Sequence, residues 1–234
     1  MVDVNRHKLF LFQILKDIYD DIELANCLGF KGGSALLFFY DLPRFSVDLD
    51  FNLLDPRKED IVYEKVRKII LGYGKISDEA KKFYGPVIVL DYGLDERKLK
   101  VEISKRNFDD QYEIRNLLGI NVRVMVPADM FAHKLYALLD RNTIINRDIF
   151  DNWFFMKNQM PVNKDIVEFR MKMTFQDYLV KCIELLEKKS DKQLLNGLGE
   201  LMDEPTKTFV RTKLRSETIT LLKFYREYPV VSSP

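Results

Sequence analysis

The sequence contains little cysteine. Its 234 residues include two cysteines, Cys27 and Cys182, which lie far apart and form no CxxC pair. This spacing excludes a zinc ribbon and argues against a disulfide framework, since such frameworks use several closely spaced cysteines. A hydrophobic core must therefore hold the fold together, and 47% of the residues are hydrophobic. A domain of this size buries roughly 70–75% of its unfolded surface.

The sequence also lacks an excess of charge of either sign. Lysine and arginine total 37 residues, and aspartate and glutamate total 36. A nearly neutral chain is not drawn as a whole to nucleic acid or to an anionic membrane. Any site for a polyanion must therefore be a local patch of basic side chains.

Long apolar runs are missing as well. The apolar segment near the N-terminus, Leu9–Leu15, contains Gln13 and leads directly into Lys16 and Asp17. No small-residue cleavage site follows it, so we expect no signal peptide. No stretch is long enough to span a bilayer, and we therefore expect a cytoplasmic protein with no membrane partner.

The hydrophobic periodicity changes along the chain. In the first half it predicts helices over 6–26, 34–40 and 61–71, a short strand near Phe30, and strands over 45–53, 87–90, 99–103 and 120–126. After Pro127 every pattern is helical, over 130–139, 144–156, 164–171, 176–188 and 208–228. We therefore predict an α+β fold, with a small mixed β-sheet and flanking helices in residues 1–126 and an all-helical region in residues 127–234.

Two aspartates alternate with apolar residues on the strand predicted over 45–53. Leu49 and Phe51 point to one face, so Asp48 and Asp50 share the other. Two carboxylates a few ångströms apart raise each other's pKa unless a cation lies between them. Mg²⁺ suits this position, because it takes oxygen ligands and is usually shared with substrate phosphates. Taken alone, the pattern also fits an ordinary solvated strand.

A third carboxylate occurs on a later predicted strand. Glu102 alternates with Lys98 and Lys100, which share its face. If this strand neighbours the strand that carries Asp48 and Asp50, the three acids form a cluster of the kind that holds two metal ions. The alternative is an ion pair between Glu102 and one of the lysines, and spacing alone favours neither.

Two glycines and a serine separate the short strand near Phe30 from the helix that follows. Gly32 and Gly33 allow the backbone to approach a ligand closely, and N–H groups at a helix N-terminus bind phosphate. Ser34 adds a hydroxyl and a cap. The segment is neither a Walker P-loop nor a GxGxxG fingerprint, and alone it fits an ordinary turn. Combined with the later Asp-x-Asp and the strand glutamate, it indicates a phosphate site beside a metal site.

Four segments recur in an order typical of one family. They are KGGSAL at 31–36, RFSVDLDF at 44–51, AHKLYALLDR at 132–141 and RDIFDNW at 147–153. Together they resemble the AbiEii/AbiGii toxin-type nucleotidyltransferases, a branch of the polymerase-β-like superfamily. That family usually has threonine where this chain has Ser34, which keeps the hydroxyl. It usually has arginine where this chain has Leu37, which removes one phosphate contact.

The resemblance implies magnesium-dependent transfer of a nucleotidyl group from a nucleoside triphosphate (NTP) to an acceptor hydroxyl, with pyrophosphate leaving. It implies that Asp48, Asp50 and Glu102 bind two Mg²⁺ ions, and that Glu102 also orients or deprotonates the acceptor. It adds Lys134 and Asp148 to the catalytic residues. The substrate-binding residues that it implies are Lys31, Gly32, Gly33, Ser34, Arg44, Ser46, Arg141 and Asp151.

On this interpretation residues 1–126 are the nucleotidyltransferase core, and the helical residues 127–234 contribute Lys134 and the RDxxD segment to the site. Lys134 and Arg141 are seven residues apart and share a helix face, and Asp148 and Asp151 are three apart and also share one. The alternative for the two aspartates is pairing with Arg147, Lys134 or Arg141.

The resemblance also implies the toxin of a toxin–antitoxin pair, with a cognate antitoxin as partner. Known relatives act on the 3′ end of tRNA, so RNA is the first expected acceptor and a protein hydroxyl the second. A different class of function stays open, in which the chain keeps the fold as a binding or regulatory protein without catalysis. The intact Asp48, Asp50 and Lys134 argue against it, because a degenerate member usually loses a carboxylate first.

A local basic patch near the C-terminus fits an RNA partner. No acid lies between Glu204 and Glu217, whereas Lys207, Arg211 and Arg215 are spaced by four and would form one stripe on a single helix. The alternative is a solvated face that is balanced by acids from elsewhere in the chain.

Overall fold

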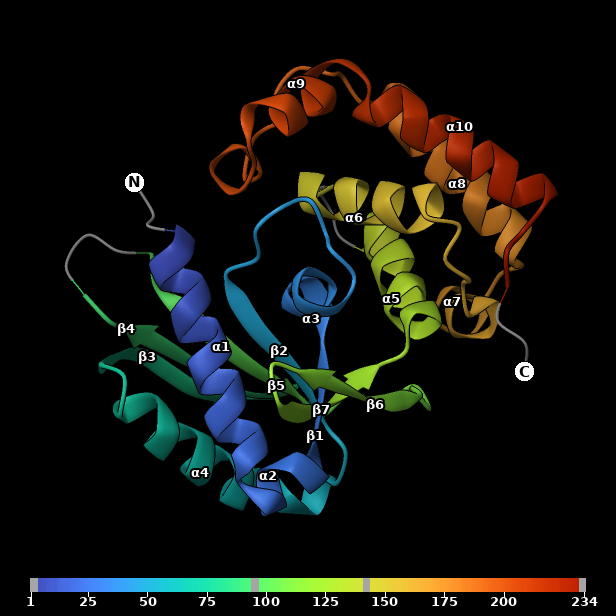
Figure 1. Cartoon of the computed structure of the whole chain (residues 1–234). Coiled ribbons are helices and arrows are strands. Elements are labelled where there is room, and N and C mark those ends of the chain that lie inside the picture. Colours follow the sequence, from blue (N-terminus) through green and yellow to red (C-terminus); the bar gives the residue numbers. More distant parts are fainter. Residues whose placement is uncertain (1–3, 94–96, 141–143, 232–234) are drawn as a thin grey trace. The chain divides into compact units, whose positions relative to one another are not determined.

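The computed structural model of the chain describes residues 4–93, 97–140 and 144–231 (Figure 1). The chain forms two compact units. The first, which we call the sheet unit, comprises Met1–Asp41 and Phe45–Met125. The second, the helical unit, comprises Leu42–Arg44 and Val126–Pro234. The short segment Leu42–Arg44 thus belongs to the helical unit although its sequence neighbours on both sides belong to the sheet unit.

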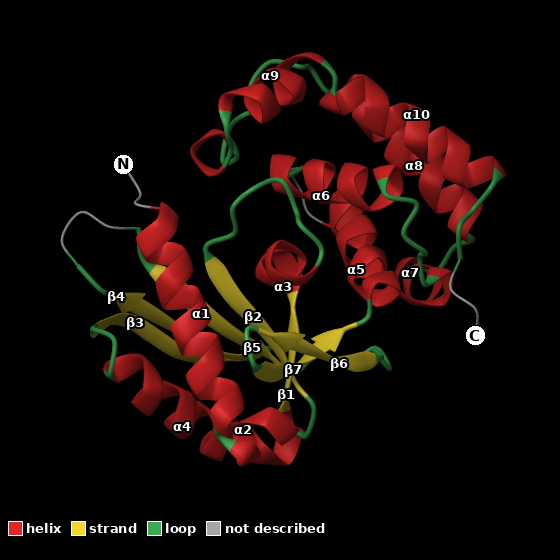
Figure 2. Ribbon diagram, in the orientation of Figure 1, coloured by secondary structure: helices red, strands yellow, loops and turns green. Residues whose placement is uncertain are grey.

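The described residues of the sheet unit form one mixed sheet of seven strands in the order β3-β4-β5-β2-β1-β7-β6 (Figure 2). β2 runs parallel to β5 and β1 parallel to β7, and the other neighbours are antiparallel. The strands are β1 Leu28–Lys31, β2 Asp48–Leu53, β3 Lys75–Lys82, β4 Gly85–Asp91, β5 Leu99–Ser104, β6 Tyr112–Leu117 and β7 Ile120–Met125. The acidic strands β2 and β5 therefore lie side by side, next to the strand that leads into the glycine turn.

Five of these strands, β1, β2, β4, β5 and β7, confirm the five that the sequence predicts. The periodicity did not predict β3 or β6, which form the two edges of the sheet. No residue of either strand is buried. An edge strand without a buried face has no need of the apolar alternation that marks the central strands, and its charged side chains discourage pairing with other chains.

The helices of the sheet unit are α1 Val4–Asp20, α2 Ile22–Cys27, α3 Gly32–Phe39 and α4 Glu59–Leu71. The single helix predicted over 6–26 is in fact α1 followed by α2. The break occurs because Asp21 takes an extended conformation and its carboxylate accepts hydrogen bonds from the backbone N–H groups of Glu23 and Leu24. Asp21 thereby caps the new helix. The other two predicted helices are confirmed as α3 and α4.

The core of the sheet unit lies on one face of the sheet, against α1 and α4 (Figure 1). Leu49 and Phe51 of β2 are fully buried there. The Tyr19 ring of α1 lies with its centroid 6.5 Å from that of Phe51. Burial of each such side chain stabilises the fold by roughly 1.5–3 kcal/mol. The strands therefore keep a fixed orientation, which directs their alternate, polar side chains to the opposite face.

The helical unit consists, in the part that the structure describes, mainly of six α-helices. They are α5 Pro127–Asp140, α6 Asn146–Lys157, α7 Lys164–Met171, α8 Phe175–Lys188, α9 Glu204–Thr212 and α10 Leu214–Glu227. The first four confirm the helices predicted in this region. The rings of Phe131 on α5 and Phe155 on α6 stack with their centroids 4.8 Å apart, and Tyr225 on α10 meets Phe131 edge-on.

The prediction of one helix over 208–228 is wrong. The chain breaks at Lys213, whose φ of −132° lies outside the helical range, and so α9 and α10 are separate helices. The predicted basic stripe is therefore wrong as well, because Lys207 and Arg211 lie on α9 whereas Arg215 lies on α10.

Acidic residues also neutralise two of these basic groups. Lys207 Nζ lies 2.7 Å from Glu204 Oε1, and Arg215 Nε lies 2.6 Å from Asp191 Oδ1. This arrangement is the alternative that the sequence left open, a solvated surface balanced by acids. The segment consequently gives no support to an RNA site.

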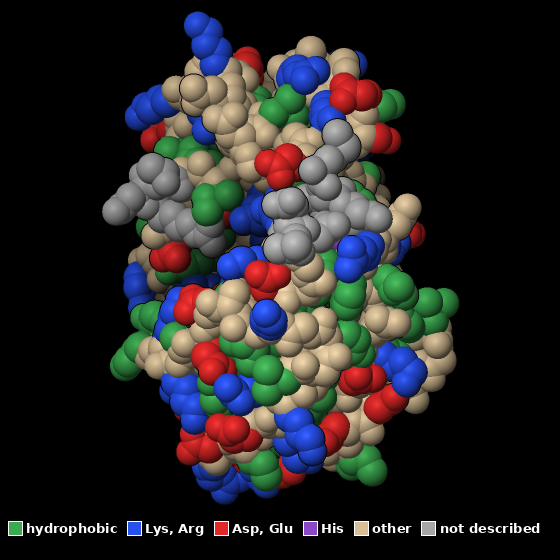
Figure 3. Space-filling model, turned by 90° about the vertical axis from the view of Figure 1, so that its left-hand side faces the viewer, with side chains coloured by type: hydrophobic (Ala, Val, Ile, Leu, Met, Phe, Trp, Pro, Cys, Tyr) green, Lys and Arg blue, Asp and Glu red, His purple; other side chains and the backbone are tan. Residues whose placement is uncertain are grey.

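Both cysteines are buried and carry free thiols. No helix within the described ranges has the length and apolar character needed to cross a membrane. On the face drawn in Figure 3, basic and acidic side chains are interspersed, in keeping with a net charge of +1.

Candidate functional site

The acidic residues of β2 and β5 come together through the register of the sheet. The two strands run parallel, with Asp50 opposite Glu102 and Asp48 opposite Lys100. On the other side of β2, β1 runs antiparallel and places Lys31 opposite Asp50. The prediction that the strand of Glu102 neighbours the strand of the two aspartates is confirmed.

We call the surface that these three strands present opposite the core the polar face. Its members follow from the register and from the two-residue alternation of strands. They are Lys31 on β1, Asp48, Asp50 and Asn52 on β2, and Lys100, Glu102 and Ser104 on β5. The polar face thus carries three carboxylates and two ammonium groups on three adjacent strands.

A lysine lies among the three carboxylates. The Lys100 ammonium is 3.0 Å from Glu102 Oε2 and 3.8 Å from Asp48 Oδ2. The ion pair that the sequence offered as an alternative to a metal cluster is therefore present. Both interpretations involve the same carboxylates, and in this structure Lys100 supplies the cation.

The surroundings shift the pKa values of two of these acids in opposite directions. Burial raises the pKa of Asp50, and the neighbouring Asp48 and Glu102 carboxylates raise it further, against the attraction of Lys100. Burial also acts to raise the pKa of Glu102, but Lys100 outweighs it and holds that pKa below its usual value. A further cation beside Asp50 would therefore stabilise the ionised form of this carboxylate.

The donor chemistry of the polar face fits a divalent cation. Asp48, Asp50 and Glu102 offer carboxylate oxygens, which are the ligands that Mg²⁺ takes. Among the described residues, no group of three or more Asp, Glu, His or Cys side chains is arranged to hold a metal ion. Lys100 lies between these acids instead, so binding of Mg²⁺ there would require the Lys100 ammonium to move away.

The glycine turn, Gly32–Ser34, meets the polar face at Asp50. Gly32 has a φ of +82°, which residues with a Cβ rarely adopt, and a Cβ at this position would lie 2.6 Å from Asp50 Oδ2. Only glycine therefore allows the backbone to pass this close to the carboxylate. The close approach places the first backbone amides of α3 beside the acids of β2.

The start of α3 is tied to the start of β2 by Ser34. The helix begins at Gly32, directly after β1, and the N–H groups of a first helical turn have no partner within the helix. Ser34 is fully buried, and its hydroxyl donates a hydrogen bond to the backbone carbonyl of Asp48. The backbone of the turn thus offers donors for a phosphate, whereas the Ser34 hydroxyl has a structural contact.

A second cluster of charges lies within the helical unit. Arg44 donates two hydrogen bonds to Asp151, from Nε to Oδ1 at 2.6 Å and from Nη2 to Oδ2 at 2.7 Å. Lys134 Nζ on α5 lies 2.8 Å from Asp151 Oδ2 and 3.5 Å from Asp148 Oδ1. The Arg44 and Asp151 side chains are 3% and 0% exposed. The pairing with Lys134 that the sequence offered as an alternative for the two aspartates is therefore confirmed.

This buried network shifts the pKa values of Asp151 and Lys134. Burial acts to raise the pKa of Asp151, but Arg44 and Lys134 outweigh burial and lower that pKa to about 2. Burial acts to lower the pKa of Lys134, but Asp151 and Asp148 outweigh it and raise that pKa. Both groups are therefore charged at neutral pH. Lys134, at 22%, is the most exposed side chain of the four.

The remaining predicted residues are placed as follows. Lys31 is partly exposed at the end of β1, and Ser46 is buried in the segment before β2. Arg141 lies outside the described residues. The polar face also includes Asn52, which was not among the predicted site residues. It lies two residues after Asp50 and so continues the alternation of Asp48 and Asp50. The catalytic and substrate-binding roles of all these residues stay predictions.

The family model described as "Nucleotidyl transferase AbiEii toxin, Type IV TA system" matches residues 13–215, which is most of the chain. No curated protein matches the chain.

Solved structures share the fold. JHP933 from Helicobacter pylori is similar with a TM-score of 0.63 and 21% identity, over 97% of this chain and 93% of that chain. A Helicobacter pylori protein provisionally named a nucleotidyltransferase has a TM-score of 0.65 and 22% identity, over 97% and 96%. An antigenic nucleotidyltransferase-like protein from Paracoccidioides brasiliensis has a TM-score of 0.54 and 15% identity, over 78% and 89%. At these identities the likeness shows the fold alone, and it confirms the predicted α+β class.

We expect Lys100→Met to make the sheet unit depend on a divalent cation. Without the ammonium the three carboxylates repel one another, and in EDTA the melting temperature should fall by about 2–4 °C, which corresponds to about 1 kcal/mol after solvent screening. Mg²⁺ should restore the melting temperature. The affinity for Mn²⁺, measured by electron paramagnetic resonance, should rise because no ammonium has to be displaced.

Lys98→Met is the matched control, since it removes an exposed lysine that lies just before β5. It should behave as wild type in EDTA and in Mg²⁺. Identical melting temperatures and Mn²⁺ affinities for Lys100→Met and wild type would contradict the assignment of Lys100 as the cation of the polar face.

We expect Asp151→Asn to destabilise the helical unit at neutral pH by about 3–5 kcal/mol, because it leaves the buried Arg44 and Lys134 without their shared carboxylate. The pKa of Asp151 falls from 3.8 to about 2 on folding. A lowered pKa adds stability that is complete above about pH 4 and is lost as the pH falls toward 2. The difference between wild type and variant should therefore shrink over that window.

Urea unfolding monitored by Trp153, the single tryptophan, measures this difference because Trp153 lies on α6 with Asp151. Asp60→Asn is the control, since Asp60 is 90% exposed and pairs only with Lys81 at the surface among the described residues. Its effect should be within about 0.5 kcal/mol. An Asp151→Asn variant as stable as wild type at pH 7 would show that the network does not stabilise the unit.

Proposed function

The chain belongs to the AbiEii family of nucleotidyl transferase toxins, and from that membership we propose that it transfers a nucleotidyl group from an NTP to the 3′-terminal hydroxyl of an RNA, with tRNA as the first candidate. The family description names a type IV toxin–antitoxin system, which implies an antitoxin as partner. Transfer of a nucleotidyl group implies an NTP substrate. We place the reaction in the cytoplasm, where NTPs and tRNA occur together.

One observation carries this proposal. The register of β2 with β5 places Asp50 opposite Glu102, and Asp48 lies two residues before Asp50 on the same face of β2. The backbone of Gly32 passes beside Asp50. Carboxylates for a cation and backbone amides for phosphate thus meet at one point of the sheet unit.

The polar face supplies the groups that the reaction needs. Asp48, Asp50 and Glu102 would hold Mg²⁺, which would neutralise phosphate charge and favour attack by the acceptor hydroxyl. The first amides of α3 would donate to phosphate oxygens, as helix N-termini do. Glu102 would also accept a hydrogen bond from the acceptor hydroxyl and orient it, since a glutamate is ordinarily ionised at neutral pH.

The bond changes are those of an in-line displacement. The acceptor oxygen forms a bond to the α-phosphorus of the NTP, and the bond from that phosphorus to the bridging oxygen of the β-phosphate breaks. Pyrophosphate leaves, and the hydroxyl proton passes to a carboxylate or to solvent. The family resemblance also assigns Lys134 and Asp148 to catalysis, and in the helical unit the two side chains form an ion pair at 3.5 Å.

We expect Asp48→Asn, Asp50→Asn and Glu102→Gln each to lower transfer by on the order of 100-fold or more, since each removes charge that stabilises the transition state. Wild type and variants are incubated with Mg²⁺, total RNA and each NTP labelled at the α-phosphate, and label in RNA is measured. The melting temperature in EDTA should not fall for Asp50→Asn, because burial raises the pKa of that carboxyl and its loss relieves repulsion.

Asp78→Asn is the matched control, since Asp78 is an exposed acid on β3 of the same unit. It should retain full activity. Unchanged transfer by Asp48→Asn and Asp50→Asn would remove the carboxylates from the mechanism. Label in protein instead of RNA would identify a protein hydroxyl as acceptor, and no transfer by wild type with any NTP would favour a binding protein without catalysis.

A further inference from the structure

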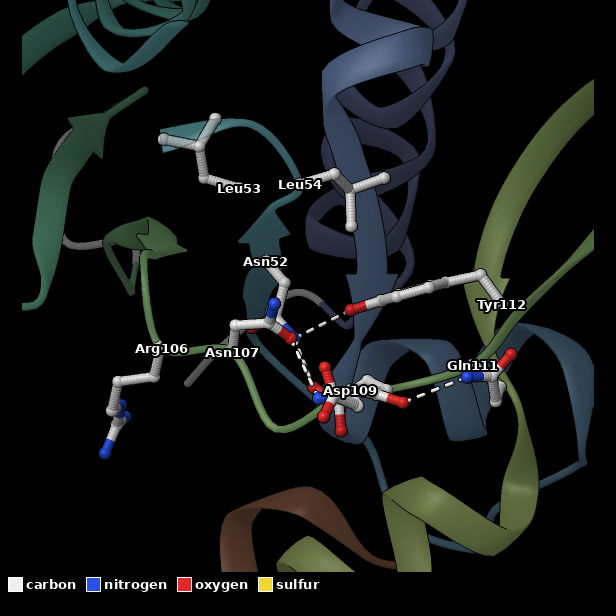
Figure 4. Close-up of a pocket in the computed structure, with 9 residues that line it drawn as sticks. Asn52, Leu53, Leu54, Arg106, Asn107, Asp109, Gln111 and Tyr112 are labelled. Carbon is white, nitrogen blue, oxygen red and sulfur yellow. Dashed lines mark hydrogen bonds between the residues drawn. The ribbon is translucent and has the colours of Figure 1, made fainter. Parts of the chain in front are cut away.

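A pocket of about 310 Å³ opens beside the polar face, within the sheet unit (Figure 4). Its walls are the end of β2 and the segment from Arg106 to Tyr112, which joins β5 to β6. Most of the lining is polar. It carries the amides of Asn52, Asn107 and Gln111, the Arg106 guanidinium, the Tyr112 phenol and the carboxylates of Asp109 and Asp110.

Asn52 joins this pocket to the carboxylates. It lies two residues after Asp50 on the same face of β2, roughly 6.5 Å farther along the strand. Asn52 Nδ2 donates hydrogen bonds to Asp110 Oδ2 at 2.9 Å and to Tyr112 Oη at 2.7 Å. Figure 4 shows the hydroxyl of Tyr112 directed toward the Asn52 side chain.

The side-chain oxygen of Asn52 lacks a hydrogen-bond partner among the described residues. Asn52 is 4% exposed, and its Oδ1 is buried and accepts no hydrogen bond from the residues that the structure describes. An unsatisfied buried carbonyl is unfavourable. A ligand in the pocket that donates an N–H or O–H group would remove this cost.

The Tyr112 ring, which forms one wall of the pocket, packs against Gly29. Gly29 lies opposite Asn52 in the register of β1 and β2. A Cβ on Gly29 would lie 2.2 Å from Cε1 of the Tyr112 ring, so the ring occupies the space that any side chain would fill. The pocket is therefore built into the sheet and does not depend on a loop alone.

Arg106 lines the pocket, and two exposed aromatic rings of the β3–β4 turn, those of Phe83 and Tyr84, lie beside it. We call these three residues the rim. The Arg106 guanidinium lies 4.9 Å from the centroid of the Tyr84 ring, and the Phe83 ring lies 5.0 Å from that of Tyr84. Phe83 and Tyr84 are 85% and 57% exposed. The backbone N–H of Lys105 donates to the Tyr84 carbonyl at 2.8 Å, which ties the β3–β4 turn to the pocket segment.

This combination matches one kind of ligand. Exposed aromatic rings stack on bases, and an arginine beside them contacts phosphate or stacks in turn, which is how proteins bind single-stranded nucleic acid. Arg106 Nε donates a hydrogen bond to Ser104 Oγ at 3.4 Å. Amides such as those of Asn52 and Asn107 recognise the edges of bases.

The direction of the reaction points to the same ligand. β1 ends at Lys31, where α3 begins, and Ser34 of the glycine turn bonds to Asp48 at the start of β2. Asn52 lies toward the other end of β2. In-line displacement brings the acceptor from the side opposite the leaving pyrophosphate. With the phosphates at the glycine turn, the acceptor must approach from the side of Asn52.

We propose that this pocket binds the terminal nucleoside of a single-stranded RNA acceptor, with its 3′-hydroxyl directed toward Glu102, and that Arg106, Phe83 and Tyr84 contact the nucleotides that precede it. The inference rests on the proposed function, because it uses the glycine turn as the site of the NTP phosphates. It names the class of acceptor and the surface that selects it.

Binding is measured by fluorescence anisotropy with a short 5′-fluorescein single-stranded RNA that ends in a 3′-hydroxyl. Phe83→Ala with Tyr84→Ala, and separately Arg106→Gln, should each weaken binding about 10-fold or more, as loss of a stacked base or a phosphate contact does. Binding of each NTP, followed by thermal shift, should be unchanged. Phe169→Ala with Lys172→Gln is the matched control, because it removes an exposed aromatic ring and its cation, 4.0 Å apart, from the helical unit.

Crosslinking tests the terminal nucleoside directly and does not depend on variants that must fold. An RNA with 4-thiouridine at its 3′ end should crosslink to residues 52–54 or 106–112, and 8-azido-ATP should not. A crosslink elsewhere, or equal RNA affinity in wild type and in both rim variants, would overturn the proposal. Labelling of the pocket by 8-azido-ATP would overturn it in favour of an NTP base site.

The two proposals fail in different ways. In one outcome, the wild-type protein transfers label to RNA while the rim variants bind RNA as tightly as wild type and the crosslinks lie outside the pocket. That outcome leaves the proposed function intact and shows that this pocket is not the acceptor site. Wild type that transfers no label to any RNA removes the acceptor itself, and the assignment of the pocket is then overturned with it.

Discussion

Charge compensation on the polar face is the constraint on which the candidate site depends. Asp48, Asp50 and Glu102 lie on two adjacent strands, which are about 4.8 Å apart in any sheet. At such separations, like charges near a protein surface repel by several kcal/mol, about 4 kcal/mol at 4 Å. Lys100 and Lys31 offset part of this repulsion, but two ammonium groups against three carboxylates leave one negative charge in excess. The polar face therefore attracts a further cation.

The cluster in the helical unit follows the same rule with a different outcome. Arg44 and Lys134 face Asp148 and Asp151, so two cations balance two carboxylates. Three of the four side chains are at most 6% exposed. A buried network of this kind, in which opposite charges pair, stabilises the unit that contains it. An unbalanced and partly exposed group of acids suits a site that binds a cation and a substrate.

Much of the sheet unit could be predicted from local pattern. The alternation of β2 shows which residues face the core, and the same alternation places Asp48 and Asp50 together. The glycine turn is also visible, because Gly32 takes a backbone conformation that other residues rarely adopt. The sequence pattern does not predict contacts between side chains that are distant in sequence. The bonds of Arg44 to Asp151 and the position of Lys100 between two acids depend on tertiary register, which spacing does not encode.

Two other features of the structure, the edge strands and the break between α9 and α10, could not be predicted, for simple physical reasons. β3 and β6 lie at the edges of the sheet and bury no residue, so they lack the periodicity that would mark them as strands. The break at Lys213 contains no glycine or proline, and α9 and α10 therefore look like one helix in sequence. That break separates the basic residues that had suggested an RNA surface. The pocket beside Asn52, which we propose as the site of the RNA acceptor, is formed by segments distant in sequence and could not be predicted from local pattern.

The most direct test of the central claim is the position of a bound cation. Crystals of the protein grown with Mn²⁺ and a non-hydrolysable NTP analogue give an anomalous difference map that locates the metal without assumptions about activity. We expect a peak bounded by Asp48, Asp50 and Glu102, with the Lys100 ammonium displaced from its contacts to Glu102 and Asp48. An ordered analogue with no anomalous peak at these carboxylates, and with Lys100 still in place, would contradict the account.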